Sequence, residues 1–124
     1  MAIGDHATAT ADGAVAVGAY NQATASNSVS IGKSSSATSN NAMALGTQSK
    51  TTADNAISMG AYSETAGNRG TAVGALAQAK GNGSFAGGAS AQATGVNSVA
   101  IGGAQDGTLT NKAGTAAKAI GNQS

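Results

Sequence analysis

The segment Asn27-Ser28-Val29-Ser30-Ile31-Gly32-Lys33-Ser34-Ser35 contains the pattern that decides the fold. Its glycine belongs to a series that recurs every 14 residues without a change of register. A fixed period of this kind is the signature of an architecture in which each repeat stacks on the next. Counting this glycine as position 1 of the repeat, the series is Gly4, Gly18, Gly32, Gly46, Gly60, Gly74, Gly88 and Gly102.

Large and small residues alternate just before each glycine. Positions 12 and 14 carry mostly large apolar side chains, whereas position 13 carries only alanine or serine. Alternation with a period of two is typical of a β-strand, whose successive side chains point to opposite faces. We therefore predict that positions 12 and 14 fill the core, with the residues Val15, Val17, Val29, Ile31, Met43, Leu45, Ile57, Met59, Val73, Val99 and Ile101.

Position 13 is expected to lie against another chain. Its side chains are uniformly small, which favours close packing of a neighbouring backbone, and an exposed position would tolerate larger polar residues. The chain also has only 15 Val, Ile, Leu and Phe residues, so its own core should be thin and further burial should occur between chains. The expected chain–chain interface consists of Ala16, Ser30, Ala44, Ser58, Ala72, Ala86 and Ala100.

A second short strand and two corners complete the repeat. Positions 6 and 8 are small and should face inward, and position 7 between them is mostly threonine and should face outward. Positions 9 to 11 are rich in Asn and Gly, which tolerate the positive φ of tight turns. The invariant glycine at position 1 indicates either a backbone angle closed to other residues or very close contact between coils. Two strands and two corners per 14 residues predict an all-β fold, a narrow parallel β-solenoid.

Composition argues against several classes of function. The net charge of +1 gives no electrostatic basis for binding nucleic acid or an anionic membrane. The sequence has no cysteine and a single histidine, so we expect no disulfide, metal or other cofactor. It also has no apolar run long enough for a transmembrane helix. Its five carboxylates form no recurring pair, and we expect no enzymatic activity.

The repeats resemble a known family. Asn27–Ser35 and the segment Asn97-Ser98-Val99-Ala100-Ile101-Gly102 closely resemble the NSVAIGxxS repeat of YadA-like head domains in trimeric autotransporter adhesins. The resemblance implies a left-handed parallel β-roll, with three rolls side by side as a homotrimer. It further implies a place on the bacterial cell surface, outside the outer membrane, with signal peptide and anchor outside this segment. Members of that family bind extracellular matrix, host cells, abiotic surfaces or one another, and the NSVAIGxxS repeats of founding members are linked to collagen binding.

The register changes near the end of the chain. The step from Gly102 to the next motif glycine, Gly121, is 19 residues instead of 14. We therefore divide the chain into head repeats at 1–104, an inserted loop or transition at 105–113, and a resumed repeat at 114–124. Inserted loops are frequent contact sites in repeat proteins.

The expected ligand-binding surface consists of exposed rows repeated along the rod, together with the inserted loop. The sequence does not identify the ligand. Two other functions remain open at this point: a phage or other fibre tip, and an ice-binding β-solenoid that uses the threonines of position 7. The candidate residues are His6, Tyr20, Gln22, Lys50, Tyr62, Glu64, Gln78, Gln92, Asp106 and Lys112.

Overall fold

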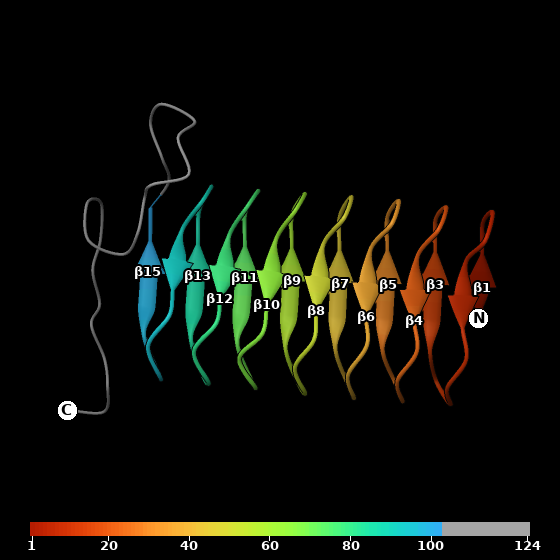
Figure 1. The fold of residues 1–124 in the computed structure, drawn as a ribbon, viewed down its shortest axis with the longest axis horizontal. Helices are drawn as coiled ribbons and strands as arrows, with labels where there is room; N and C mark the ends of the chain where they lie inside the picture. Colours follow the sequence, from red (N-terminus) through yellow and green to blue (C-terminus); the bar gives the residue numbers. More distant parts are fainter. Residues whose placement is uncertain (103–124) are drawn as a thin grey trace.

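The computed structural model describes residues 1–102, which form a rod of short strands wound into coils that follow one another along its length (Figure 1). Each coil contributes two strands. The three-residue strands span positions 12–14 of the repeat: β3 (Val15–Val17), β5 (Val29–Ile31), β7 (Met43–Leu45), β9 (Ile57–Met59), β11 (Thr71–Val73), β13 (Phe85–Gly87) and β15 (Val99–Ile101). The two-residue strands are β1 (Ala2–Ile3) at the N-terminus and, at positions 5–6, β2 (Thr8–Ala9), β4 (Gln22–Ala23), β6 (Ser36–Ala37), β8 (Lys50–Thr51), β10 (Glu64–Thr65), β12 (Gln78–Ala79) and β14 (Gln92–Ala93).

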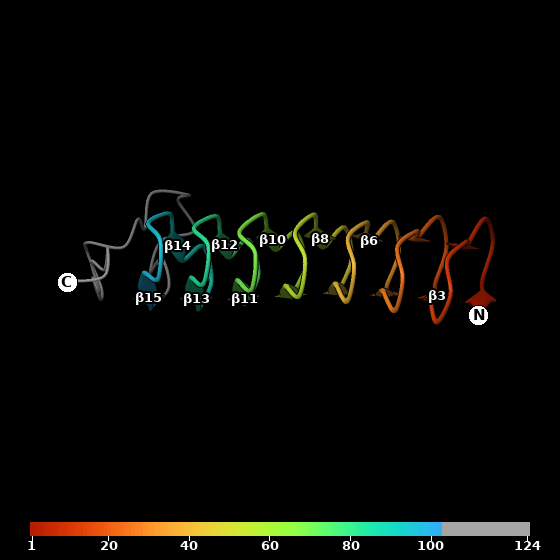
Figure 2. The same ribbon diagram turned by 90° about the horizontal axis from the view of Figure 1, so that it is seen from below.

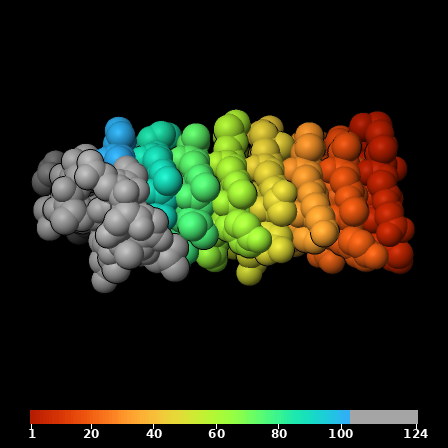
Figure 3. Space-filling model, turned by 90° about the horizontal axis from the view of Figure 1, so that it is seen from above, coloured from red at the N-terminus to blue at the C-terminus, as the bar shows by residue number. Residues whose placement is uncertain are grey.

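The strands form two sheets that run along the rod in separate layers (Figure 2). The odd-numbered strands make an eight-stranded sheet and the even-numbered strands a seven-stranded sheet, and every neighbouring pair is parallel. The register follows the repeat, so that Val15 pairs with Val29 and Gln22 pairs with Ser36. The predicted all-β parallel solenoid is thus confirmed, and the space-filling view shows its coils as successive layers (Figure 3).

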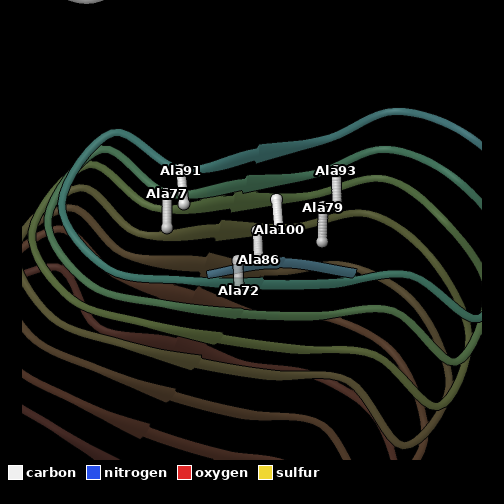
Figure 4. Close-up of a cluster of buried hydrophobic side chains, with 7 residues drawn as sticks. All are labelled: Ala72, Ala77, Ala79, Ala86, Ala91, Ala93 and Ala100. Carbon is white, nitrogen blue, oxygen red and sulfur yellow. The ribbon is translucent and has the colours of Figure 1, made fainter. Parts of the chain in front are cut away.

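The space between the sheets is filled by small side chains. Alanines from β11, β13 and β15 face alanines from β12, β14 and the residues just before them across this narrow interior (Figure 4). Position 6 points inward as predicted, because Ala23, Ala37 and Ala79 are fully buried. The interior of each coil therefore accepts only small side chains, which explains why position 4 is also restricted to Ala, Ser and one Asn.

The predicted core and interface are reversed in the structure. The alanines and serines of position 13, predicted to face another chain, are at most 2% exposed and lie inside the roll. The large apolar residues predicted to fill the core are instead half-buried or exposed on the outer face of the eight-stranded sheet. Both assignments are wrong for the same physical reason, since a 14-residue coil has no room between its sheets for opposed valines and isoleucines. The affected residues are the core set Val15, Val17, Val29, Ile31, Met43, Leu45, Ile57, Met59, Val73, Val99 and Ile101, and the interface set Ala16, Ser30, Ala44, Ser58, Ala72, Ala86 and Ala100.

Buried hydroxyl groups connect the two sheets in the middle of the rod. Thr65 Oγ1 in β10 donates to the Ile57 carbonyl oxygen in β9 at 2.7 Å, and Ser58 Oγ lies 2.8 Å from both Thr65 Oγ1 and the Lys50 carbonyl oxygen. Thr51 Oγ1 donates in the same way to the Met43 carbonyl oxygen at 2.8 Å. Such bonds contribute about 0.5–1.5 kcal/mol each and satisfy groups that would be costly to bury alone. They compensate in part for the lack of large apolar side chains inside.

The corner glycine at position 1 meets both of the expected constraints. Gly32 has φ of +127°, and a Cβ placed there would lie 2.6 Å from the carbonyl oxygen of Gly46 in the next coil. Position 3 of the same corner is left-handed too, although most of its residues are neither Gly nor Asn, as with Tyr20 at φ 58° and Leu76 at φ 62°. The Leu76 N–H donates to the Ala61 carbonyl oxygen of the preceding coil at 2.9 Å, so stacking holds this conformation.

Candidate functional site

The outer face of the eight-stranded sheet carries a row of mostly apolar side chains, in which Thr71 is the polar exception. We call this row, formed by positions 12 and 14, the apolar stripe. Ile31, Met59, Val73 and Ile101 are between 37% and 56% exposed in the single chain. Exposed apolar areas that are large and contiguous mark interaction surfaces. The stripe is the strongest such feature of the described residues.

The stripe is kept filled where the repeat pattern fails. Gly87 replaces the usual large residue at position 14, but its neighbour Phe85 replaces the usual aliphatic residue at position 12. The Phe85 ring covers the gap, because a Cβ at Gly87 would lie 2.7 Å from Phe85 Cε1. The two departures compensate each other in volume and preserve an apolar surface in that coil.

The position 3 residues of the predicted ligand surface lie on one corner. His6 stacks on Tyr20 with ring centroids 4.9 Å apart and an angle of 6° between the planes, and its Nδ1 lies 2.8 Å from Asp5 Oδ1. Tyr20 and Tyr62 are more than half exposed. Two coils lie between them, with Ser34 and Gln48 at position 3, so the rings do not form one patch.

The position 5 residues of the predicted ligand surface lie on the seven-stranded sheet. Gln22 and Lys50 are exposed, and Glu64, Gln78 and Gln92 are half-buried. Glu64 pairs in register with Lys50 on one side and Gln78 on the other. The remaining candidates, Asp106 and Lys112, lie outside the described residues, as do the segments 105–113 and 114–124.

A polar hollow lies at the corner formed by positions 9 and 10, and the sequence analysis did not identify it. Its volume is about 550 Å³, and it spans four successive coils. The only signal in the sequence is a change at position 10, where Asn27, Asn41 and Asn55 are followed by Arg69 and a glycine. We call this site the polar hollow; its lining residues are Asp54, Asn55, Asn68, Arg69, Asn82, Gly83, Val96 and Asn97.

The described residues offer no arrangement typical of catalysis. No group of three His, Asp or Glu side chains that could hold a metal ion occurs within 1–102. The buried side chains with polar groups in this range are serines, threonines and one asparagine. In the same range, no helix is long and apolar enough to cross a membrane.

Comparison with known proteins agrees with the geometry. The search of curated proteins found no match to this chain. The family model of the YadA head domain repeat, which comprises two copies of the repeat, matches residues 1–21, 13–35, 23–49, 37–63, 66–91 and 88–104. These overlapping matches cover more than half of the chain and follow the coils of the solenoid. The chain therefore belongs to the YadA head domain family.

Proposed function

We propose that this chain is a segment of an adhesin head, displayed on the bacterial cell surface as a rigid homotrimeric rod. Its role is attachment to extracellular matrix, host cells, abiotic surfaces or other bacteria, without catalysis. The family resemblance supports the trimer, the left-handed winding and the surface location. The observation that carries the proposal is the apolar stripe, which runs along one whole sheet and is exposed in the single chain.

The stripe accounts for assembly in physical terms. The apolar residues of each coil are divided so that alanines close the roll and the larger side chains lie outside it. Complete burial of a fully exposed Ile or Met side chain contributes about 1.5–3 kcal/mol. Ile31 and Met59 are 42% and 38% exposed, so burial between chains adds somewhat less than half of this for each, and the repeat offers such a contribution in nearly every coil. Three rolls that turn their eight-stranded sheets toward a common axis would bury all three stripes against one another. The sheets of the other layer, with Gln22, Lys50, Glu64, Gln78 and Gln92, would then face outward.

The test of assembly compares two charged substitutions on opposite faces of the rod. Ile31→Asp places a carboxylate in the stripe, and Thr38→Asp places one on an exposed position of the other layer. We expect multi-angle light scattering to show a trimer for the wild type and for Thr38→Asp at micromolar concentration. Ile31→Asp should abolish the trimer, with or without loss of the fold, because an obligate oligomer need not have a stable monomer. A trimer of unchanged stability in Ile31→Asp would contradict the proposed interface.

The test of adhesion uses the assembled rod. The wild-type trimer should bind at least one of collagen, fibronectin, laminin, cultured host cells or itself, and the Thr38→Asp trimer serves as a second assembled form. Weak contacts repeated along three chains give strong binding by avidity. Failure of the trimer to bind any of these, and to self-associate, would make a passive spacer the better interpretation.

A further inference from the structure

The polar hollow has a composition that points to a ligand. Within residues 1–102 the Arg69 guanidinium makes no ion pair and no side-chain hydrogen bond. Four asparagine side chains surround it, and the one apolar neighbour, Val96, is 46% exposed. The hollow has a volume of about 550 Å³ and is open to solvent, since each of its lining residues is exposed.

The hollow is rich in donors because the backbone uses the amide oxygens. Asn68 Oδ1 accepts from the Asp54 N–H at 3.2 Å, and Asn82 Oδ1 accepts from the Asn68 N–H at 3.0 Å. Each of these side chains is thereby fixed with its oxygen toward the preceding coil. Their Nδ2 groups make no hydrogen bond with any described residue and remain available as donors.

The asparagine column at position 10 also leaves an unbonded amide group at the hollow. Asn27 Nδ2 donates to Asn41 Oδ1 at 3.4 Å, and Asn41 Nδ2 donates to Asn55 Oδ1 at 3.1 Å. The next residue in this column is Arg69, which has no acceptor, so Asn55 Nδ2 has no partner among residues 1–102. The column is thus interrupted at the hollow, and the interruption leaves one more free donor beside the guanidinium.

The second interruption changes the lining of the hollow. Gly83 occupies the asparagine position in the following coil and adopts φ of +67°. The amide oxygen of Asn97 lies directly over it, so a side chain at Gly83 would have to displace that amide and would narrow the hollow. Asp54 is the single carboxylate in the lining, and its Oδ1 already accepts from the Asn40 N–H at 3.0 Å. The lining therefore carries one positive charge, on Arg69, and one negative charge, on Asp54, and the two groups form no ion pair with each other. The free amide groups of Asn55, Asn68 and Asn82 are N–H donors.

We infer that the polar hollow binds an acidic saccharide, with its anionic group on Arg69 and its hydroxyl oxygens on the amide donors of Asn55, Asn68 and Asn82. Guanidinium groups bind carboxylate and sulfate with paired hydrogen bonds, and both are acidic groups of saccharides. Neighbouring coils repeat the donors at about 4.8 Å, which is comparable to the length of one sugar ring. Val96 offers an apolar surface for the C–H face of such a ring. This inference rests on the proposed function, since it names a ligand class for the adhesin.

The experiment uses the trimeric protein and two matched substitutions of cations. Arg69→Asn removes the guanidinium and continues the asparagine column with a residue that tolerates the left-handed conformation of Arg69, at φ 57°. Lys80→Gln removes an exposed cation from another part of the rod. Gly83→Asn, at a position that also tolerates asparagine, narrows the hollow without a change of charge. The probes are sialyllactose with lactose as its neutral counterpart, a hyaluronan hexasaccharide that carries only carboxylates, and a sulfated heparin hexasaccharide.

We expect the wild-type trimer to bind at least one acidic probe in surface plasmon resonance and not to bind lactose. Arg69→Asn and Gly83→Asn should each weaken binding at least tenfold, and Lys80→Gln should change it less than twofold. Binding of sialyllactose or hyaluronan would assign the site to carboxylates, and binding of heparin alone would assign it to sulfates. Absence of binding to every acidic probe would overturn the inference. Equal losses in Arg69→Asn and Lys80→Gln would also overturn it, because they would indicate diffuse charge attraction.

Light scattering and matrix binding on the same samples separate this inference from the proposed function. A trimer that adheres to matrix proteins but binds no acidic saccharide would overturn the saccharide site alone. A monomer that binds the saccharide through Arg69 but fails in adhesion would overturn the proposed assembly and leave the site in place.

Discussion

Replacing the corner glycine Gly60 with alanine tests how closely the coils are stacked. Gly60 has φ of +127°, a region that L-residues rarely adopt, and a Cβ there would lie 2.5 Å from the Gly74 carbonyl oxygen. Optimal contacts between such atoms are about 3.5 Å, so the added methyl group is too close by about 1 Å. Because the obstructing atom belongs to the backbone of the next coil, rotation of a side chain cannot relieve the contact.

The cost of Gly60→Ala has two parts. The unfavourable backbone conformation costs about 1–3 kcal/mol. Separation of the coils also weakens the bonds on either side of the corner, which are Gly74 N–H to Met59 oxygen at 2.7 Å and Leu76 N–H to Ala61 oxygen at 2.9 Å, at about 0.5–1.5 kcal/mol each. We therefore expect the free energy of unfolding to fall by about 2–6 kcal/mol per chain.

Thermal and urea unfolding at matched chain concentration measure this loss. The control is Ala66→Thr, which adds a side chain to the same coil at an exposed position where most other repeats carry threonine. It should change stability by no more than about 0.5 kcal/mol. A loss below about 1 kcal/mol in Gly60→Ala would show that the coils can separate at little cost, and would refute the role assigned to the glycine series.

Three further substitutions test the placement of side chains within a coil. Ala44→Leu inserts a large side chain between the sheets at a fully buried position and should lower the free energy of unfolding by at least about 1–3 kcal/mol. The adjacent substitution Leu45→Ala should mainly weaken trimer assembly, measured by dilution. The opposite result would support the core that was predicted from the sequence. Leu76→Asn replaces a left-handed leucine at φ 62° with a residue that tolerates this conformation, and should raise stability by about 1 kcal/mol in the same unfolding assay. A decrease in Leu76→Asn would show that packing of the leucine outweighs its backbone strain.

The strands and corners could be predicted because the same residue pattern recurs in successive copies of the repeat. Large and small residues alternate over positions 12 to 14 in every coil except that of Gly87, and the glycine at position 1 keeps its register from Gly4 to Gly102. The Asn and Gly residues at position 10 also indicated a left-handed turn, which the structure has at Asn27, Asn41, Asn55 and Asn97. Local chemistry was sufficient for these features because each depends on residues within one coil.

The direction of the faces could not be read from alternation alone. A period of two shows that positions 13 and 14 point to opposite sides, but it does not state which side is enclosed. The residues around the second strand of the repeat indicate which face is enclosed. Positions 4, 6 and 13 are all small, and two sheets whose facing residues are Ala, Ser or Thr must lie very close together. Larger residues such as Ile31 and Met59 then have no place except outside.

The polar hollow was missed because it depends on departures from the repeat rather than on the repeat. Asparagine is the usual residue at position 10, and an analysis based on the usual residue overlooks Arg69 and Gly83. The hollow forms where coil stacking places these two exceptions next to each other, between Asn55 and Asn97. Its recognition requires hydrogen-bond partners and the local free volume, which are properties of the stacked coils.

The regular and irregular parts of this chain therefore have different consequences. The regular positions determine shape and assembly, because small residues close each coil and larger ones accumulate on a single outer face. A chain built in this way leaves most of its larger apolar side chains exposed unless it has partners, so the feature that makes the roll thin also favours its association. The irregular positions, such as Arg69 and Gly83, contribute little to the roll itself. A charged side chain or a glycine can occur at these positions without disturbing the stacking of the coils. The irregular positions are consequently those at which one rod of this kind can acquire a ligand that another does not bind.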